Sequence, residues 1–128
     1  MNPGPAVSET FSRDDRLRKR REFEECYATG VRVSGRHLQV FLLADSTSKR
    51  PRLGISVPRR VGTAVRRNRV RRRLREIFRR TRSLFENTAP RVVINARPSS
   101  AGAAFSELLE DYRSAVTRAL KAVKTPRR

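Results

Sequence analysis

The chain has 128 residues, a length that accommodates one domain with a single modest core. Its one cysteine, Cys26, and its one histidine, His37, exclude an intramolecular disulfide and a zinc site of the Cys/His type. Thirty-one Lys and Arg residues against twelve Asp and Glu residues give a net charge of +19, which favours a nucleic acid as partner over an anionic membrane surface.

The positive charge is concentrated in the middle of the chain. Residues 49–82 contain fifteen basic residues and one acidic residue, which accounts for +14 of the total. Most are arginines, whose planar guanidinium group binds phosphates and stacks on bases, so RNA or DNA is favoured. No apolar run has the length of a signal-peptide core or of a membrane span, and we expect a reducing, cytoplasmic location.

The N-terminal part predicts a short helix with two aromatic residues. Residues 1–11 are polar and contain Pro and Gly, and we expect them to be disordered. A helix is predicted over 19–30, ended by Gly30 as its C-terminal cap. Phe23 and Tyr27 are four residues apart and share one face. Packing in the core is the leading interpretation for Phe23, with stacking on a nucleobase as the alternative for Tyr27 and for Phe41 of the next element.

Two strands with alternating patterns follow. Over residues 38–42 every second side chain is aliphatic, which predicts a strand with two different faces. Over residues 52–57 three larger apolar side chains face one way, and Gly54 and Ser56 face the other. Because Gly54 and Ser56 leave room above the sheet, we expect a large group to lie over them. We place His37, just before the first of these strands, at the surface.

The arginine-rich stretch 61–80 predicts an amphipathic helix. One stripe is apolar and predicted to face the core: Val70, Leu74, Ile77 and Phe78. The opposite stripe is polar and mostly cationic: Asn68, Arg72, Arg75 and Arg79. An ordinary solvated helix face carries mixed charges, but Glu76 is the only acidic residue here, so an anionic partner is favoured. We expect the regular helix to begin near Asn68, after a bent approach.

A strand over 91–96 and a long amphipathic helix from Phe105 complete the pattern. The predicted order is α-β-β-β-α-β-α. This is an α+β fold, an α/β sandwich with helices packed on a four-stranded sheet. We expect one RNA-binding domain over 12–122 and a basic tail over 123–128.

The run RLGISVPRRVGTAVRRNRVRRRLRE, residues 52–76, resembles the signature of the bacterial ribonuclease P protein subunit. That family has a strand containing Gly and Ser, a basic pair, a Gly-x-Ala-Val turn, and then Arg-Asn-Arg on a basic helix. Here the basic pair is Arg59–Arg60 and the Arg-Asn-Arg motif is 67–69. The resemblance extends over residues 12 to 120.

The resemblance implies an accessory subunit rather than a catalyst. In the family, the RNA subunit cleaves precursor tRNA with the help of metal ions, which removes the 5′ leader. The protein binds that RNA and holds the single-stranded leader in a cleft between its first helix and its sheet. The resemblance thus implies no catalytic residue on this chain, magnesium held mainly by the partner RNA, a 1:1 complex with ribonuclease P RNA, and no membrane contact. It also implies a left-handed crossover at the basic helix, an uncommon sense for such a connection.

The resemblance assigns two groups of site residues. The leader-binding cleft would contain Phe23, Tyr27, Phe41 and Ser56. The RNA-binding basic motif would contain Arg67, Asn68, Arg69, Arg71, Arg72 and Arg75; helical spacing adds Arg79, and Arg59 and Arg60 are additional basic contacts. Gln39 stands where the family cleft often has an apolar residue.

Other hypotheses remain open at this point. A structural RNA-binding protein of the ribosomal type, without processing activity, would have a similar composition and differ only in the Arg-Asn-Arg context and the aromatic cleft. A nuclease acting alone is disfavoured, because no paired carboxylates stand in a polar context and His37 has no evident partner for acid–base chemistry. A helix-turn-helix protein is weaker still, because a strand follows the basic helix.

Overall fold

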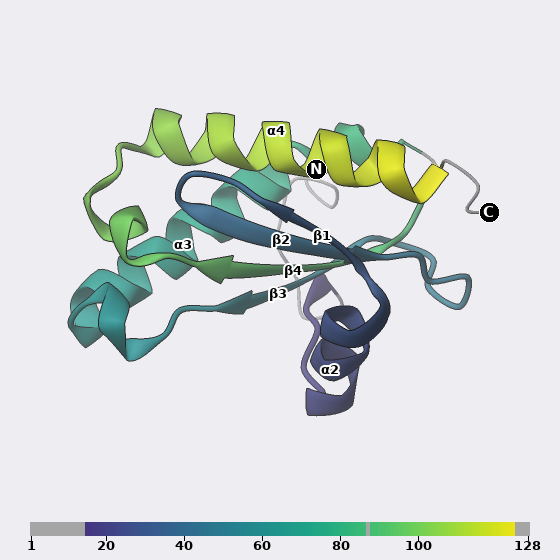
Figure 1. Ribbon diagram of the computed structural model, residues 1–128, viewed down its shortest axis with the longest axis horizontal. Coiled ribbons are helices and arrows are strands. Elements are labelled where there is room, and N and C mark those ends of the chain that lie inside the picture. The colour runs from purple at the N-terminus through teal and green to yellow at the C-terminus, as the bar shows by residue number, and fades with distance from the viewer. Residues whose placement is uncertain (1–14, 87, 125–128) are drawn as a thin grey trace, which may run out of the picture.

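The computed structural model describes residues 15–86 and 88–124, which form a four-stranded sheet with helices on both faces (Figure 1). In chain order the elements are α2 (Arg20–Thr29), β1 (Val31–Ser34), β2 (Leu38–Leu43), β3 (Arg52–Ser56), η2 (Arg59–Val61), α3 (Ala64–Arg80), η3 (Arg82–Phe85), β4 (Arg91–Ala96), η4 (Pro98–Gly102) and α4 (Phe105–Lys124), where η marks a 3-10 turn. The predicted order of helices and strands is confirmed. The segment 1–11 lies outside the described residues. The predicted tail is described only at 123–124, where α4 continues.

The sheet is mixed, with the strand order β1-β2-β4-β3. β2 pairs with β1 and β4 in the antiparallel sense, and β3 pairs with β4 in the parallel sense. Because parallel neighbours need a crossover, α3 connects β3 to β4. The left-handed sense of that crossover stays a prediction.

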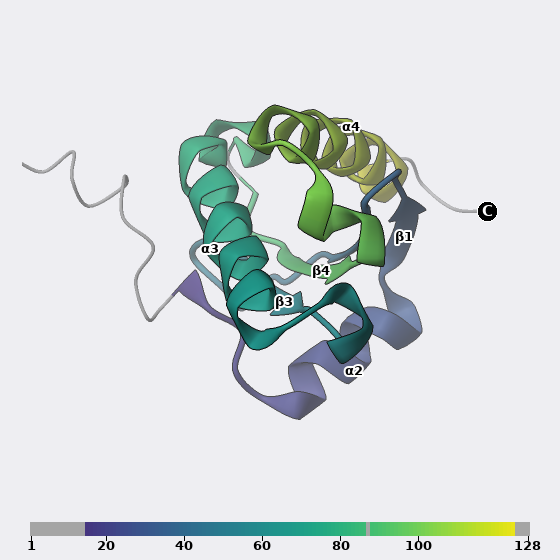
Figure 2. The same cartoon turned by 90° about the vertical axis from the view of Figure 1, so that its left-hand side faces the viewer.

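The helices divide the molecule into three layers (Figure 2). α3 and α4 cover one face of the sheet, and the larger hydrophobic cluster fills the space between. α2 covers part of the other face with a smaller cluster built from Leu17, Cys26, Phe41 and Val93. Alternate residues of β2 supply the two clusters, as the sequence pattern predicts: Val40 belongs to the first and Phe41 to the second.

Helix α3 buries the predicted apolar stripe of Val70, Leu74, Ile77 and Phe78. The prediction that regular helix begins near Asn68 is wrong. The helix begins at Ala64, because the Thr63 side chain caps it by accepting a hydrogen bond from the Arg66 N–H at 3.3 Å. Residues 64–67 are thus part of the helix rather than a bent approach.

Gly30 ends α2 as predicted, but its backbone is extended, with φ at −78°, rather than left-handed as in most glycine caps. Glycine is required there for a different reason. A Cβ atom would lie 2.6 Å from the carbonyl oxygen of Cys26 and 3.1 Å from that of Leu42. The close approach of the carbonyl oxygen of Cys26 in the last turn of α2, together with that of Leu42 in β2, therefore selects Gly30.

Asp111 on α4 anchors the turn between β1 and β2. Its two carboxylate oxygens accept hydrogen bonds from the backbone N–H groups of Arg36, His37 and Leu38 at 2.8–3.0 Å. The expected surface position of His37 is wrong: the turn is held against α4, His37 is 8% exposed, and its Nδ1 lies 2.8 Å from the Ser99 hydroxyl. No helix within the described residues is long and apolar enough to cross a membrane.

Candidate nucleic-acid interface

The register of the sheet arranges the α2 face in three cross-strand rows. A charged row contains Arg91 and Arg52, and an apolar row contains Phe41, Val93 and Gly54. A polar row contains Gln39, Asn95 and Ser56, which are direct neighbours across β2, β4 and β3. Because side chains alternate along a strand, residues two apart in each strand share this face.

Phe23 lies over Gly54 in the apolar row. A Cβ atom at Gly54 would be 2.5 Å from Cζ of the Phe23 ring. This confirms for Gly54 the expectation that a large group covers the small residues of β3, whereas Ser56 lines the open groove described below. Phe23 packs against the smaller core cluster and stays partly exposed, so it helps to hold α2 on the sheet and is still accessible at the surface.

Tyr27 is the aromatic residue that the structure exposes most on this face. Its side chain is 40% exposed, and its ring packs edge-on against Phe41 with centroids 4.8 Å apart. The hydroxyl donates to Oδ1 of Asn95 at 2.9 Å and is hydrogen-bonded to Ser56. Burial of the hydroxyl raises the pKa of Tyr27, so it stays a neutral donor. Phe41 is only 7% exposed and therefore backs Tyr27 rather than offering a face of its own.

A groove of about 640 Å³ runs between α2, β3 and α3 beside these rings. We call it the aromatic compartment; it is lined by Arg18, Arg20, Phe23, Glu24, Tyr27, Ile55, Ser56, Val57 and Arg71. Ser56 also lines an adjoining hollow of about 280 Å³, the polar compartment, with Gln39, Pro58, Arg60, Asn95, Ala96 and Arg97. Three of the four predicted cleft residues line the groove, and Phe41 lies behind it.

Arg71 joins the groove to the basic helix. It lines the aromatic compartment and donates from Nη1 to Oδ1 of Asn68 at 3.0 Å. The pKa of Arg75 lies below its ordinary value, because burial removes water from the guanidinium and because Arg16 and Arg71 are nearby positive charges. Positive charge therefore accumulates where α3 meets the groove, and an anion would relieve the repulsion.

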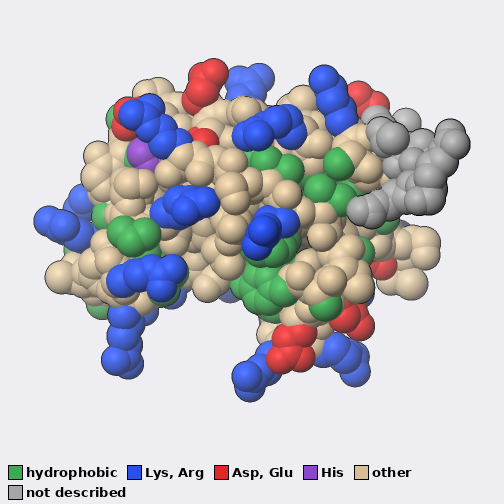
Figure 3. Space-filling view, viewed as in Figure 1, with side chains coloured by type: hydrophobic (Ala, Val, Ile, Leu, Met, Phe, Trp, Pro, Cys, Tyr) green, Lys and Arg blue, Asp and Glu red, His purple; other side chains and the backbone are tan. Residues whose placement is uncertain are grey.

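The other predicted basic residues fall into two sets. Some are engaged inside the protein: Arg67 donates to the carbonyl of Val57 at 3.4 Å, and Arg79 is paired with Glu76. Others point to solvent: Arg59, Arg60, Arg69 and Arg72 are exposed, and no carboxylate of the described residues pairs with them. In Figure 3 blue side chains project at the left-hand end of the molecule, where η2 and α3 begin.

Carboxylates neutralise the opposite end of the face. In the charged row, Arg52 pairs with Glu22 at 3.0 Å, and Arg91 pairs with Glu25 and Asp45. The pKa of Asp45 is lowered to about 2, mainly by the hydrogen bond from the Thr47 hydroxyl. Hydrogen bonds from the Thr47 backbone and from Arg91 lower it further, whereas burial of the carboxylate acts in the opposite direction. On this face, the end at the charged row is therefore balanced by carboxylates, whereas the end near η2 and the start of α3 has exposed arginines that pair with no carboxylate among the described residues.

Residues with reactive chemistry contribute little to this face. Burial raises the pKa of the Cys26 thiol to about 11, so the thiol is protonated and unreactive at neutral pH. Within 15–86 and 88–124 no group of three or more His, Cys, Asp and Glu residues could hold a metal ion.

Asn95 is a site residue that sequence analysis missed. Only the strand pairing, which places it beside Gln39 and Ser56, reveals that it belongs to this face.

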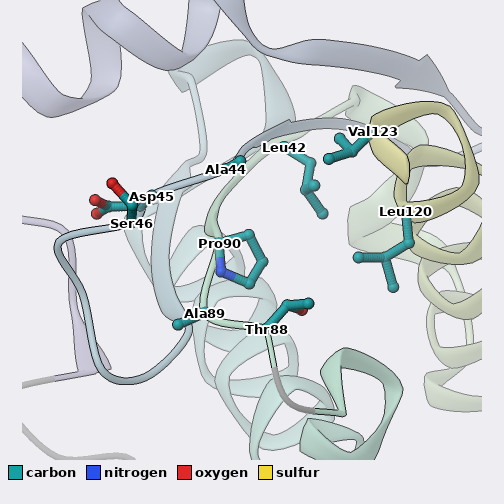
Figure 4. A pocket seen from close by; sticks show the side chains of 9 residues that line it. All are labelled: Leu42, Ala44, Asp45, Ser46, Thr88, Ala89, Pro90, Leu120 and Val123. Atoms are coloured by element: carbon teal, nitrogen blue, oxygen red, sulfur yellow. The ribbon is translucent and has the colours of Figure 1, made fainter. Parts of the chain in front are cut away.

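An apolar pocket of about 230 Å³ lies at the far end of the sheet, beside the end of α4 (Figure 4). Leu42, Pro90, Leu120 and Val123 point toward its space, while Asp45 and Ser46 turn away from it. No Lys or Arg lines the pocket. It has no chemistry for a polyanion, so the groove beside α2 is the candidate interface.

Comparisons with known proteins identify the family of the chain. The family model described as Ribonuclease P matches residues 11–120. The ribonuclease P protein component of Acidothermus cellulolyticus is 40% identical over 98 residues, which cover 76% of this chain and 81% of the relative. That of Desulfosudis oleivorans is 37% identical over 107 residues, covering 77% and 86%.

Solved structures show the same fold. The RNase P protein from Thermotoga maritima superposes with a TM-score of 0.72 at 29% identity, covering 80% of this chain and 96% of its own. The Staphylococcus aureus RNase P protein gives a TM-score of 0.70 at 27% identity, covering 86% and 95%. By sequence and fold, the chain belongs to the bacterial ribonuclease P protein family.

Proposed function

We propose that this chain binds ribonuclease P RNA through α3 and η2 and holds the single-stranded 5′ leader of precursor tRNA in the groove beside α2. Membership of the family supports an RNA-processing role for the chain. One observation carries the finer assignment: Arg71 lines the aromatic compartment and is hydrogen-bonded to Asn68 of the basic motif. A strand in the groove would therefore lie next to the surface that binds the folded RNA.

The groove has the properties of a single-strand site. Exposed aromatic rings accept any base by stacking, and arginines at the rim attract the backbone. Tyr27 supplies the exposed ring, and Arg18, Arg20 and Arg71 supply the charges. A duplex has its bases stacked inside and could not use this ring, so the groove favours an unpaired leader.

The surface for the catalytic RNA is formed by exposed arginines that pair with no carboxylate among the described residues. Arg69 and Arg72 on α3 and Arg59 and Arg60 in η2 fit this role best. Arg79 was predicted to belong to the same stripe, but its pairing with Glu76 already offsets part of its charge. We therefore place the main contact on the first half of α3.

The chemistry of cleavage is assigned to the RNA. Glu24 is the one carboxylate in the lining of the aromatic compartment, and it is exposed and paired with Arg20 at 3.2 Å. Acid–base catalysis by a protein uses two titratable groups whose environments separate their pKa values, and the lining offers no such pair. Magnesium would be held by RNA phosphates in a 1:1 complex of RNA and protein.

Reconstitution tests the proposal. The purified chain is mixed with a bacterial ribonuclease P RNA at low magnesium, and cleavage and affinity are measured for leader-bearing precursor tRNA and mature tRNA. We expect the protein to increase cleavage and to favour the leader-bearing substrate. No such effect would refute the proposal and leave a structural RNA-binding protein as the better interpretation.

Two variants separate the groove from the basic surface. Tyr27→Ala should weaken the preference for leader-bearing substrate and leave the salt dependence unchanged. Arg72→Ala should weaken RNA binding in general and reduce the slope of log K against log salt by about 0.7–0.9. Arg118→Ala, on the exposed side of α4, is the control for loss of one arginine. Exchanged outcomes for Tyr27 and Arg72 would contradict the division of roles.

A further inference from the structure

We propose that the exposed side of α4 is a self-complementary docking surface, through which two copies of this chain pair with their α4 helices antiparallel. The surface is the α4 stripe, which runs from carboxylates in the first half of the helix to cations in the second: Glu107, Glu110, Ser114, Arg118 and Lys121. It lies on a part of the fold that neither the groove nor the basic helix uses, so the proposal does not depend on leader binding.

The five residues of the α4 stripe form one row along the helix. An α-helix turns by about 100° per residue, so spacings of 3, 4, 4 and 3 residues keep the row within about 80° of the circumference. All five residues are exposed. The other side of α4 packs on the sheet, with Leu108, Tyr112 and Val116 fully buried. The stripe therefore points away from the core, where a second molecule can reach it.

The charges of the stripe change sign symmetrically about Ser114. Glu110 and Arg118 each lie four residues from Ser114. Glu107 and Lys121 each lie seven residues from it. When two stripes are aligned antiparallel on Ser114, every carboxylate faces a cation of the second copy. A two-fold axis repeats each contact, so both Glu110–Arg118 pairs form together, and the small serine at the axis lets the helices approach closely.

The helix dipole does not account for this pattern. It favours carboxylates in the first turn of a helix and cations in the last turn, and its effect falls off beyond those turns. Glu107 follows this rule, and its Oε1 accepts a hydrogen bond from the Ala104 N–H at 2.8 Å. Glu110 and Arg118 lie more than one turn inside α4, and neither has an ion-pair partner among the described residues. Their charges are therefore available to a second molecule.

A hollow beside the carboxylates can receive the arginine of the second copy. It has a volume of about 330 Å³ and is lined by Arg36, His37, Ser106, Glu107, Glu110 and Asp111. The carboxylate of Asp111 is already bound to backbone N–H groups of the β1–β2 turn. Glu107 and Glu110 thus supply the remaining negative charge, against the single arginine of this lining. The side chain of Arg118 from the second copy would balance that charge.

The α4 stripe also lets two copies meet without strong repulsion. The chain has a net charge of +19, which opposes self-association in general. The stripe has two carboxylates and two cations, and its net charge is therefore zero. α4 covers the opposite face of the sheet from α2 (Figure 2). Pairing through α4 leaves both grooves open, and the complex keeps one RNA for each protein.

Sedimentation equilibrium of the purified full chain tests the proposal. Exposed ion pairs are individually weak, so we expect a reversible dimer with a dissociation constant on the order of 100 µM. Glu110→Arg and Arg118→Glu should each raise that constant at least about tenfold, because each places like charges opposite one another at both symmetry-related positions. Arg32→Glu, the same charge change on the α2 face of β1, is the control and should dimerise at least as well as the wild type.

Reversal of both charges separates docking from a structural role. The double variant Glu110→Arg/Arg118→Glu again has opposite charges on the two sides of Ser114, so its dissociation constant should return to within about threefold of the wild type. An equimolar mixture of the two single variants should form a heterodimer, because one is cationic and the other acidic at both positions. A residue that acts only on stability would show neither effect.

Three results would overturn the proposal. A wild type that stays monomeric at about 1 mM would leave the stripe as an ordinary solvated helix face. Single variants that dimerise as well as the wild type would show that another surface holds the dimer. A mixture that forms no heterodimer would contradict the antiparallel alignment. Thermal unfolding shows that each variant is folded; should one single variant not fold, the other and the double variant decide the matter.

Discussion

Gly54→Ala should displace the Phe23 ring and lower both stability and leader binding. The added Cβ would lie 2.5 Å from Cζ and 2.7 Å from Cε2 of the ring. Ordinary contacts between carbon atoms are about 3.5–4.0 Å, so the ring must move by about 1 Å. Overpacking of this kind costs about 1–3 kcal/mol. The Leu17 Cβ would also lie 3.3 Å from the added atom, and we expect the Phe23 ring to shift toward the groove that it lines.

Urea unfolding of the free protein measures the first effect, and the affinity of the reconstituted complex for leader-bearing and mature tRNA measures the second. Gly102→Ala is the matched control, because a Cβ at Gly102 would meet no atom within 4 Å. It should be neutral or stabilise by about 0.4–1 kcal/mol through the unfolded state. We expect Gly54→Ala to lose affinity for the leader-bearing substrate alone.

The reasoning would be refuted by a Gly54→Ala variant that unfolds within about 0.5 kcal/mol of Gly102→Ala and binds the leader normally. A double variant adds a second test. Phe23→Leu removes the atoms that clash, so it should cost less in the Gly54→Ala background than in the wild type. Additive effects would show that the two residues do not interact.

Three further outcomes are expected. Thr63→Ala should lower the free energy of unfolding by about 1 kcal/mol, because α3 loses its cap, whereas Thr63→Ser should match the wild type in urea unfolding. Cys26, with its pKa raised to about 11, should react with iodoacetamide at pH 8 slowly in the folded protein and rapidly in urea; fast labelling of the folded protein would contradict its burial. The Asp45 pKa of about 2 lies below its ordinary 3.8, so Asp45 stabilises the fold above that ordinary value and loses this effect as the pH falls toward 2. Asp45→Asn should therefore unfold with a flatter pH dependence between 4 and 2, and equal slopes would overturn the assignment.

The sequence predicts those elements of the fold in which side-chain periodicity is strong. The buried stripe of α3 and the two faces of β2 follow from spacing alone, because each face packs against a separate hydrophobic cluster. The start of α3 could not be placed this way. The helix starts where the Thr63 side chain accepts a hydrogen bond from the Arg66 N–H. This local contact leaves no trace in the spacing of apolar residues, on which the prediction was based.

Part of the site could also be predicted from the size and spacing of side chains along the chain. Gly54 and Ser56 indicate space above β3, and the aromatic side chains of the preceding helix, Phe23 and Tyr27, indicate what can lie there; Phe23 is the one over Gly54. Asn95 carries no such signal, because a single polar residue in an apolar strand gains its role from the pairing of β4 with both neighbours. The burial of His37 likewise depends on Asp111, which is more than seventy residues away in the chain.

The position of β4 has a consequence for how the protein is made. β4 lies between β2 and β3, yet it is the last strand to be synthesised. The first three strands cannot complete a sheet before residue 96 leaves the ribosome, and α3 is until then a cationic helix whose apolar stripe has no cover. Non-local pairing of this kind is slow and leaves aggregation-prone surface exposed. A chain that stops before Arg91 would lack the strand that joins β2 to β3 and could not complete the sheet.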